Sequence, residues 1–262
     1  MKFNKSKKGE LTTQQIVLLI ILIASFAIIL FFFFRLNLQG QTLEQTCHNS
    51  VLLQNKLKTG DLQCSTSYIC FSGNGECSDI SPTETIKISL GDLSAEKTNI
   101  FRNIADKMYS CWWMMGEGKI DYTSGLAISN QKICALCSSF SFDQKIQNDF
   151  KDSQPTYGEF YNYLAQTKKD NSQTYLNYLY GVDSVDKLSG FDATKKFDFS
   201  KKYSLITYQI NKGFFSGTVD SIKGVFGENS NSDTQNVYSL SVNVLNNTEV
   251  KELGCATFVT KS

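Results

Sequence analysis

The chain has 262 residues, a formal net charge of +1, 41% hydrophobic residues and 13% aromatic residues. This composition excludes an intrinsically disordered chain, because apolar and aromatic side chains supply the surface that a core buries. Arginine occurs only as Arg35 and Arg102, and no basic stripe runs through residues 36 to 262, so the sequence gives no support for nucleic-acid binding.

The N-terminal part of the chain predicts a membrane anchor. A basic leader, residues 1 to 15, precedes the run 16 to 34, in which Ser25 is the only polar residue. A helix that rises about 1.5 Å per residue would carry this run across most of a hydrocarbon core of roughly 30 Å. A cleaved secretory signal would have a shorter apolar region and small residues at both recognition positions, which Leu38 and Gly40 do not supply together.

The charges around the apolar run predict its orientation. Four lysines precede it and one arginine follows it (Lys2, Lys5, Lys7, Lys8 and Arg35). Positive flanks stay in the cytoplasm, so the sequence predicts a single-pass protein of the cell membrane with a cytoplasmic N-terminus. Residues 37 to 262 would be extracytoplasmic, and the lipid bilayer would be the first partner.

After the apolar run, three segments with different residue patterns follow. Residues 35 to 60 have a helical pattern that stops at Gly60, which predicts a stalk helix continuing from the span. Residues 61 to 81 are rich in cysteine and turn residues, and residues 82 to 262 have the patterns of a larger domain.

Within residues 82 to 262 the predicted elements are mixed. Strands are expected at 85 to 90, 119 to 122, 132 to 142, 203 to 210, 237 to 245 and 253 to 260, and helices at 95 to 115, 156 to 167 and 173 to 180. Ser94 is the expected cap of the first helix, and Thr156 with Glu159 forms a capping-box pattern for the second. A polar loop is expected at 227 to 234. The predicted fold class is α+β.

All eight cysteines follow the apolar run: Cys47, Cys64, Cys70, Cys77, Cys111, Cys134, Cys137 and Cys255. An even number of cysteines in an exported region predicts disulfides. Eight cysteines allow 105 pairings, so the connectivity has to come from local geometry.

Local geometry favours two of the pairs. Cys70 and Cys77 flank Ser72-Gly73-Asn74-Gly75, a turn-forming cluster that suits a tight hairpin. Cys47 with Cys64 would close a second local loop. The remaining four cysteines would staple the larger part of the fold, with their partners left open.

In the leader, Lys7-Lys8-Gly9 is followed by Glu10 and the apolar run. In this pattern, residues 1 to 35 resemble the archaeal class III signal peptide family of type IV pilin-like proteins. The resemblance implies cleavage between Gly9 and Glu10 and a helix that packs with other copies as a filament core. An uncleaved signal anchor is the alternative. A second pattern consists of Cys111-Trp112-Trp113, Gly116-Glu117-Gly118 and Cys134-Ala135-Leu136-Cys137. It is similar to uncharacterised archaeal membrane proteins, which implies no function.

Cys134 and Cys137 form a C-x-x-C, the spacing of thiol oxidoreductases. The surrounding residues 132 to 142 have a strand pattern, which would aim the two side chains at opposite faces of a sheet. Two structural disulfides to different partners are therefore favoured, with a thiol oxidoreductase as an alternative. A zinc site would need four ligands, and no second C-x-x-C is present.

Few other residues suggest catalysis. His48, the only histidine, lies in the predicted stalk, where a solvated side chain is expected. Carboxylates that could serve glycoside hydrolysis are Glu117, Asp121, Glu159 and Asp183, but the sequence selects no pair among them.

Two surface features complete the candidates. A group of aromatic residues suggests either the roof of a core or a surface that contacts carbohydrate or protein. Its members are Tyr157, Phe160, Tyr161, Tyr163, Tyr175, Tyr178 and Tyr180. Asn246-Asn247-Thr248 is a glycosylation sequon.

The sequence therefore predicts a membrane-anchored extracytoplasmic protein of structural or interaction type. It indicates no enzymatic activity, catalytic residue, cofactor, metal, small-molecule substrate or nucleic-acid partner. The expected partners are other membrane or surface proteins, or copies of the same chain. The alternatives are a pilin-like filament subunit and an exported thiol oxidoreductase.

Overall fold

The computed structural model describes residues 13–35, 38–58, 62–89, 91–123, 131–169, 172–188, 192–211 and 237–261. These residues belong to two compact units, Met1–Thr42 and Leu43–Ser262. The expected cleavage point at Gly9 and Glu10 and the expected loop at 227 to 234 lie outside the described residues.

The first unit contains one complete helix. α1 (Thr13–Arg35) contains the whole apolar run, so the predicted helix is present. Each of its large apolar side chains from Ile16 to Phe31 is 39% to 65% exposed. Within the described residues, no helix combines the length and the apolarity needed to cross a membrane. The membrane anchor stays a prediction.

The second unit begins inside α2 (Leu38–Leu57). Cys47 and Val51 are buried in the main core, and Cys47 is joined to Cys64 by a disulfide. The expectation of a stalk is therefore wrong for residues 43 to 57, because one face of this helix packs into the domain. Residues 36 and 37, where the stalk was expected to continue from the span, lie outside the described residues.

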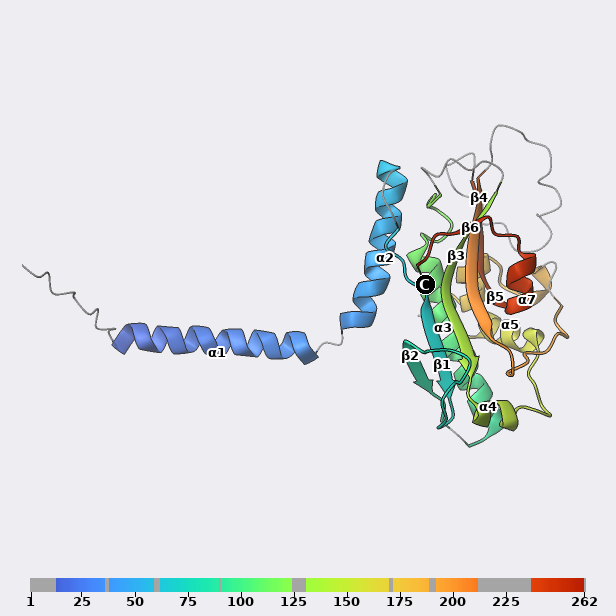
Figure 1. The fold of residues 1–262 in the computed structure, drawn as a ribbon, viewed down its shortest axis with the longest axis horizontal. Helices are drawn as coiled ribbons and strands as arrows, with labels where there is room; N and C mark the ends of the chain where they lie inside the picture. Colours follow the sequence, from blue (N-terminus) through green and yellow to red (C-terminus); the bar gives the residue numbers. More distant parts are fainter. Residues whose placement is uncertain are drawn as a thin grey trace, which may run out of the picture. The chain divides into compact units, whose positions relative to one another are not determined.

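A mixed sheet organises the domain (Figure 1). Its order is β2-β1-β3-β4-β5, with β6 beside β3. The strands are β1 (Ser67–Ser72), β2 (Glu84–Lys87), β3 (Lys132–Phe142), β4 (Tyr203–Asn211), β5 (Val237–Asn246) and β6 (Thr257–Phe258). Strands β1, β2 and β3 run parallel, whereas β4 is antiparallel to both β3 and β5.

The sheet corrects two predictions about residues 61 to 81. Strand β1, inside the predicted cysteine-rich segment, pairs with β2 and β3 of the predicted larger domain. The boundary at 81 and 82 therefore does not divide the domain. The turn after β1 does not form the expected hairpin, because β1 has parallel neighbours and residues 73 to 83 carry the chain to the sheet edge.

Helix α3 (Leu93–Met114) connects β2 to β3. Its buried stripe includes Ile100, Ile104 and Met108, and the spacing of three to four residues explains why one side packs on the sheet. Gly116 at φ +80° follows the helix end. The cap residue at its start is Asp92, not Ser94, and Asp92 makes no side-chain cap bond.

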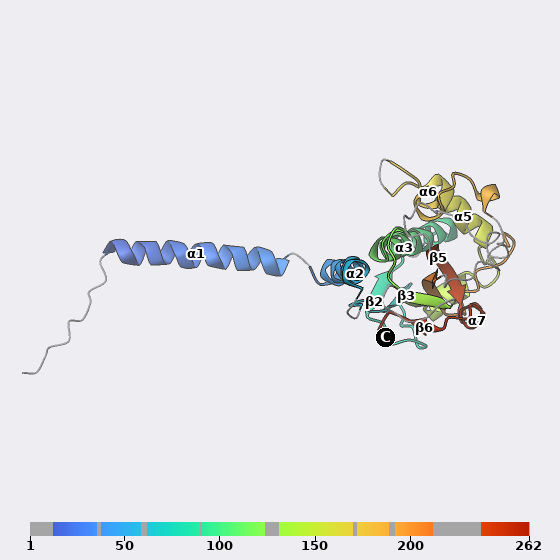
Figure 2. The ribbon, with the colours of Figure 1, turned by 90° about the horizontal axis from the view of Figure 1, so that it is seen from above.

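The remaining helices are short. They are α4 (Gln144–Asp149), α5 (Tyr157–Gln166), α6 (Tyr175–Tyr180), a 3-10 turn at Val185–Lys187, and α7 (Asn247–Glu252). Figure 2 shows α3, α5 and α6 on the same side of the sheet. The capping box that was predicted for α5 is present, with bonds in both directions between Thr156 and Glu159.

Two predicted strands differ from the structure, and two helices were not predicted. Residues 119 to 122 form bends and a turn instead of a strand, and α4 and α7 are the helices that were not expected. Of residues 253 to 260, only Thr257–Phe258 is a strand. Segments this short carry little periodic signal, and their conformation depends on caps and on neighbouring strands.

The sheet separates two hydrophobic clusters. The large cluster includes residues of α3, α5 and α6 together with Ala135 and Cys137 of β3. The small cluster contains Cys134, Ile206 and Tyr208, against which Val250 and Leu253 pack. Neighbouring residues of β3 thus reach opposite faces, as strand alternation requires.

Candidate functional site

Four disulfides use all eight cysteines of the sequence: Cys47–Cys64, Cys70–Cys77, Cys111–Cys137 and Cys134–Cys255. No cysteine is free in the described part of the chain. The two locally argued pairs are the ones that the structure forms. The other two pairs resolve the connectivity that the sequence left open.

The C-x-x-C cysteines do not bond to each other. Cys137 is joined to Cys111 of α3, whereas Cys134 is joined to Cys255 on the other face of the sheet. Thiol oxidoreductases cycle a disulfide within the C-x-x-C, and metal binding needs thiolates. Among the described residues there is neither a disulfide within the C-x-x-C nor a free cysteine. These cysteines fasten a helix and the C-terminal segment to β3.

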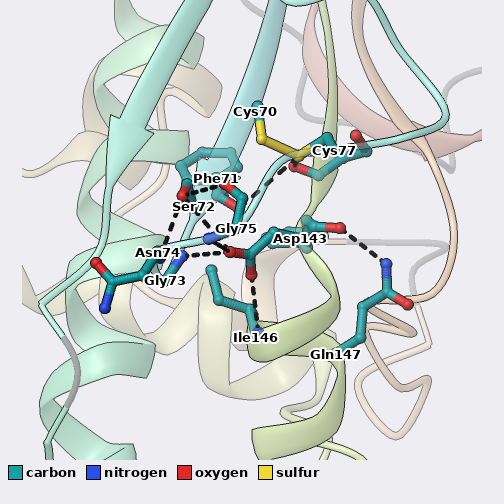
Figure 3. Close-up of a disulfide and its surroundings, with 12 residues drawn as sticks. Cys70, Phe71, Ser72, Gly73, Asn74, Gly75, Cys77, Asp143, Ile146 and Gln147 are labelled. Carbon is teal, nitrogen blue, oxygen red and sulfur yellow. Dashed lines mark hydrogen bonds between the residues drawn. A yellow bond between two sulfur atoms is a disulfide. The ribbon is translucent and has the colours of Figure 1, made fainter.

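The loop after β1 is held by one buried carboxylate (Figure 3). The Oδ2 atom of Asp143 accepts hydrogen bonds from Gly73 N at 2.8 Å and Gly75 N at 2.6 Å. Its Oδ1 atom accepts a bond from Ile146 N at 2.9 Å, which caps α4. Asp143 is completely buried, so a single side chain satisfies backbone groups of two segments.

The same loop is braced from the other side. The Cys70–Cys77 disulfide closes its base, with the two Cα atoms 5.7 Å apart. A Cβ on Gly75 would lie 2.8 Å from Asp143 Oδ2, so no larger residue fits there without a shift. Asn74, at φ 101°, and Glu76 are exposed at the tip. A strained and exposed turn on a rigid base can present a fixed surface to a partner.

Asp143 was missed by the sequence analysis. The available signal was its position directly after strand residues 132 to 142 and before a short segment, since aspartate is a preferred N-cap residue. The hydrogen bonds to Gly73 and Gly75 could not be found in this way, because Asp143 lies 70 residues after Gly73 and 68 residues after Gly75 in the sequence.

A second cluster lies at the C-terminal end of α3. The ring of His48 stacks on Trp113 with a centroid distance of 4.1 Å. His48 Nδ1 lies 2.8 Å from the Trp113 carbonyl oxygen, so Nδ1–H is the donor. The expectation of a solvated histidine is wrong, because this half-buried side chain attaches α2 to α3.

Glu117 follows in the turn after α3. Its backbone has φ 55°, and its carboxylate accepts a bond from Tyr178 Oη at 2.7 Å and pairs with Lys119 Nζ at 2.7 Å. Burial acts to raise its pKa, but the bonds from Lys119 and Tyr178 and the nearby His48 hold the pKa below 4.5. Tyr178 also stacks on Tyr109 of α3 at 4.2 Å. The structure thus brings together His48, Glu117 and Tyr178.

The contacts of this cluster connect helices. The imidazole, the carboxylate and the phenol are each bound to a neighbouring group, and together they join α2 and α6 to the end of α3. Burial and the bond to Glu117 raise the pKa of Tyr178 well above 10, so the phenol keeps its proton as a donor.

The other candidate carboxylates make local contacts. Asp121 accepts bonds from Thr123, Glu159 pairs with Lys97 at 2.6 Å, and Asp183 pairs with Lys187 at 2.8 Å. These contacts stabilise a turn, a helix start and a surface pair.

The aromatic residues form the roof of the core, which is one of the two expected roles. Tyr157, Phe160, Tyr161, Tyr175 and Tyr180 are buried, and Tyr163 and Tyr178 are half-buried. The hydroxyl groups of Tyr161 and Tyr180 lie 3.2 Å apart, and burial raises the pKa of both. The buried members of this group do not form a contact surface.

Comparison of the chain with protein families, curated proteins and solved structures gave no match.

Proposed function

We propose that the protein is an extracytoplasmic protein of structural or interaction type, held at the cell membrane by residues 16 to 34. The observation that carries this proposal is the use of all eight cysteines in four disulfides, every one after residue 43. Disulfides persist in oxidising compartments and are rare in the reducing cytosol. A domain fastened in this way suits the outer side of a membrane.

The sequence and α1 support the anchor. The run 16 to 34 contains one polar residue, and the large apolar side chains of α1 from Ile16 to Phe31 are exposed all around the helix. A helix that is apolar on every side is stable only in an apolar environment. Basic residues before the run favour a cytoplasmic N-terminus and an extracytoplasmic domain.

The loop braced by Cys70–Cys77 supports a role in interaction. Its tip is exposed at Asn74 and Glu76, while Asp143 and the disulfide hold its backbone. Such a loop loses little conformational entropy when it binds. The partners we propose are other membrane or surface proteins, or further copies of this chain.

We assign no catalytic role to the polar groups described above. Asp143 is bonded to three backbone N–H groups, Glu117 to Tyr178 and Lys119, and His48 to Trp113. Each contact has a structural purpose in the fold.

A pilin-like subunit is the second candidate. The exposed apolar surface of α1 could be covered by the same helix of neighbouring copies instead of by lipid, and the part of the leader that ends at Gly9 resembles class III signal peptides. The anchored protein would keep residues 1 to 9, whereas the filament subunit would lose them.

Intact-mass spectrometry of the protein from its native membrane, alkylated without prior reduction, tests both candidates. A retained leader and no added alkyl groups are expected for the anchored protein. Loss of residues 1 to 9 would favour the filament subunit and lead to imaging of filaments. Two alkylated cysteines would contradict the structural role of the disulfides and favour the thiol oxidoreductase.

Topology is tested separately on intact cells. After mild reduction, a maleimide that cannot cross membranes should label cysteines of the domain, and a sample reduced and labelled after lysis gives the full signal for comparison. Labelling only after lysis would overturn the extracytoplasmic location.

A further inference from the structure

The triplet Asn246-Asn247-Thr248 lies at a surface junction of the fold. Strand β5 ends at Asn246 and α7 begins at Asn247. Asn247 and Thr248 are exposed, and Asn246 is half-buried. The Asn-x-Thr pattern is the acceptor sequence for N-linked sugar when it is presented outside the cytoplasm.

The oxygen and the nitrogen of the Asn246 side-chain amide have different roles. Its Oδ1 atom accepts bonds from Thr248 N at 3.0 Å and Glu249 N at 3.2 Å, which caps α7. The Asn246 backbone N–H donates to Glu249 Oε2 at 2.8 Å, which completes a capping box. The cap uses the oxygen of the amide only. A substituent on Nδ2 would therefore leave these three bonds intact.

We propose that Asn246 is an N-glycosylation site, modified by an oligosaccharide carried on a lipid phosphate. In the transfer, Asn246 Nδ2 forms a bond to the anomeric carbon of the sugar and gives up one proton to a base of the transferring enzyme. The bond between that carbon and the phosphate oxygen breaks, and the lipid phosphate leaves with the electron pair. No oxidant or reductant is involved.

This inference rests on the extracytoplasmic location proposed above. The chain contains a second triplet of the same type, Asn4-Lys5-Ser6, in the leader. In the proposed orientation Asn4 is cytoplasmic and Asn246 is outside. One modified asparagine is therefore expected, and the unmodified Asn4 serves as an internal control for orientation.

The test is peptide mapping and intact-mass measurement of the full chain from its native membrane. Three variants separate the sugar from the cap. Thr248→Ala removes the acceptor pattern and keeps the cap, because Thr248 contributes only its backbone N–H to it. Thr248→Ser is the matched control that keeps the pattern. Asn246→Asp keeps the capping oxygens and removes Nδ2.

The expected result is added sugar mass on the Asn246 peptide in the natural protein and in Thr248→Ser. Thr248→Ala and Asn246→Asp should lose all of this mass, while their unfolding midpoints shift by no more than about 2 °C. An unmodified Asn246 in a protein whose cysteines are labelled on intact cells would overturn the inference and leave the proposed function standing. Failure of that labelling would overturn both, and sugar mass that persists in Thr248→Ala would place the modification elsewhere and overturn this site.

Discussion

At the scale of single residues, Asp143 links two segments of the fold. It is completely buried, and its carboxylate accepts hydrogen bonds from the backbone N–H groups of Gly73, Gly75 and Ile146, with the Ser72 hydroxyl 3.5 Å from Oδ2. Backbone amides around an anion form a favourable cradle even without a formal positive charge. The side chain thereby joins the turn after β1 to the start of α4.

Replacing Asp143 tests this role. Asp143→Ala should lower the free energy of unfolding by about 3–5 kcal/mol, because it leaves three backbone donors without their acceptor and removes the cap of α4. Asp143→Asn keeps one oxygen and should cost less, about 1–2 kcal/mol. Urea unfolding followed by tryptophan fluorescence measures both. Asp152→Ala, at an exposed position, is the control and should change stability by less than about 0.5 kcal/mol. Equal effects for Asp143→Ala and the control would refute the role.

Gly75 gives a second prediction at the same site. A Cβ at Gly75 would lie 2.8 Å from the Asp143 carboxylate, whereas a Cβ at Gly91 would have no heavy atom within 4 Å. Gly75→Ala should therefore destabilise the protein by about 1–3 kcal/mol. Gly91→Ala should be neutral or slightly stabilising, because alanine restricts the unfolded chain. The two variants carry the same chemical change, so a pair of denaturation curves that coincide would rule out the crowding at Gly75.

At the scale of elements, the short helices depend on their first residues. α4 starts at the Asp143 cap, while α5 and α7 start with capping boxes, Thr156 with Glu159 and Asn246 with Glu249. Helices this short are unstable alone, so caps and packing decide whether they form. The box of α5 was visible in the sequence. The box of α7 has the same chemistry but was not predicted, because it lies in the short interval between the strands expected at 237 to 245 and 253 to 260.

The α5 box predicts a pH dependence. Burial acts to raise the pKa of Glu159, but the bonds from Lys97 and from Thr156 outweigh it and hold the pKa below 4.5. A carboxylate whose pKa is lower in the folded state contributes stability above its unfolded pKa and loses it as the pH falls through the folded pKa. The group is partly exposed, so the effect is small, about 1–2 °C in the unfolding midpoint.

The measurement compares the natural protein with Glu159→Gln by calorimetry. At about pH 7 the natural protein should unfold at the higher temperature, and the difference should shrink as the pH falls from about 5 to 3. Glu76→Gln, at an exposed position, is the control for removing one carboxylate. A difference that grows toward low pH would contradict the assigned direction.

At the scale of the whole molecule, the disulfides divide into local and long-range links. Cys70–Cys77 closes a separation of 7 residues, whereas Cys134–Cys255 closes one of 121 and fixes the C-terminal segment on the second face of the sheet. The longer the closed loop, the more the link restricts the unfolded chain.

Removing each link should therefore have different consequences. The double variant Cys134→Ser with Cys255→Ser should lose about 4–5 kcal/mol of unfolding free energy, and Cys70→Ser with Cys77→Ser about 2 kcal/mol. Urea unfolding under oxidising conditions gives both values, with the fully disulfide-bonded protein as reference. A larger loss of unfolding free energy on removing Cys70–Cys77 than on removing Cys134–Cys255 would contradict this order. It would mean that the contacts of the loop around Asp143, and not the entropy of the unfolded chain, dominate the effect.

The sequence alone determined those features whose physical cause is local. The apolar run made α1 a helix, the spacing of apolar residues located α3, and alternation placed β3 with Cys134 and Cys137 on opposite faces. Turn residues and short separations were enough for Cys70–Cys77 and Cys47–Cys64.

The tertiary structure decided what depends on contacts between distant segments. It set the sheet order, packed residues 43 to 57 of the predicted stalk onto the domain, paired Cys111 with Cys137, and brought Asp143 to a loop about 70 residues away. The periodicity of a sequence records which face of an element is apolar, because each residue contributes to it independently. It does not record which other element covers that face, because this depends on the packing free energy of the whole chain.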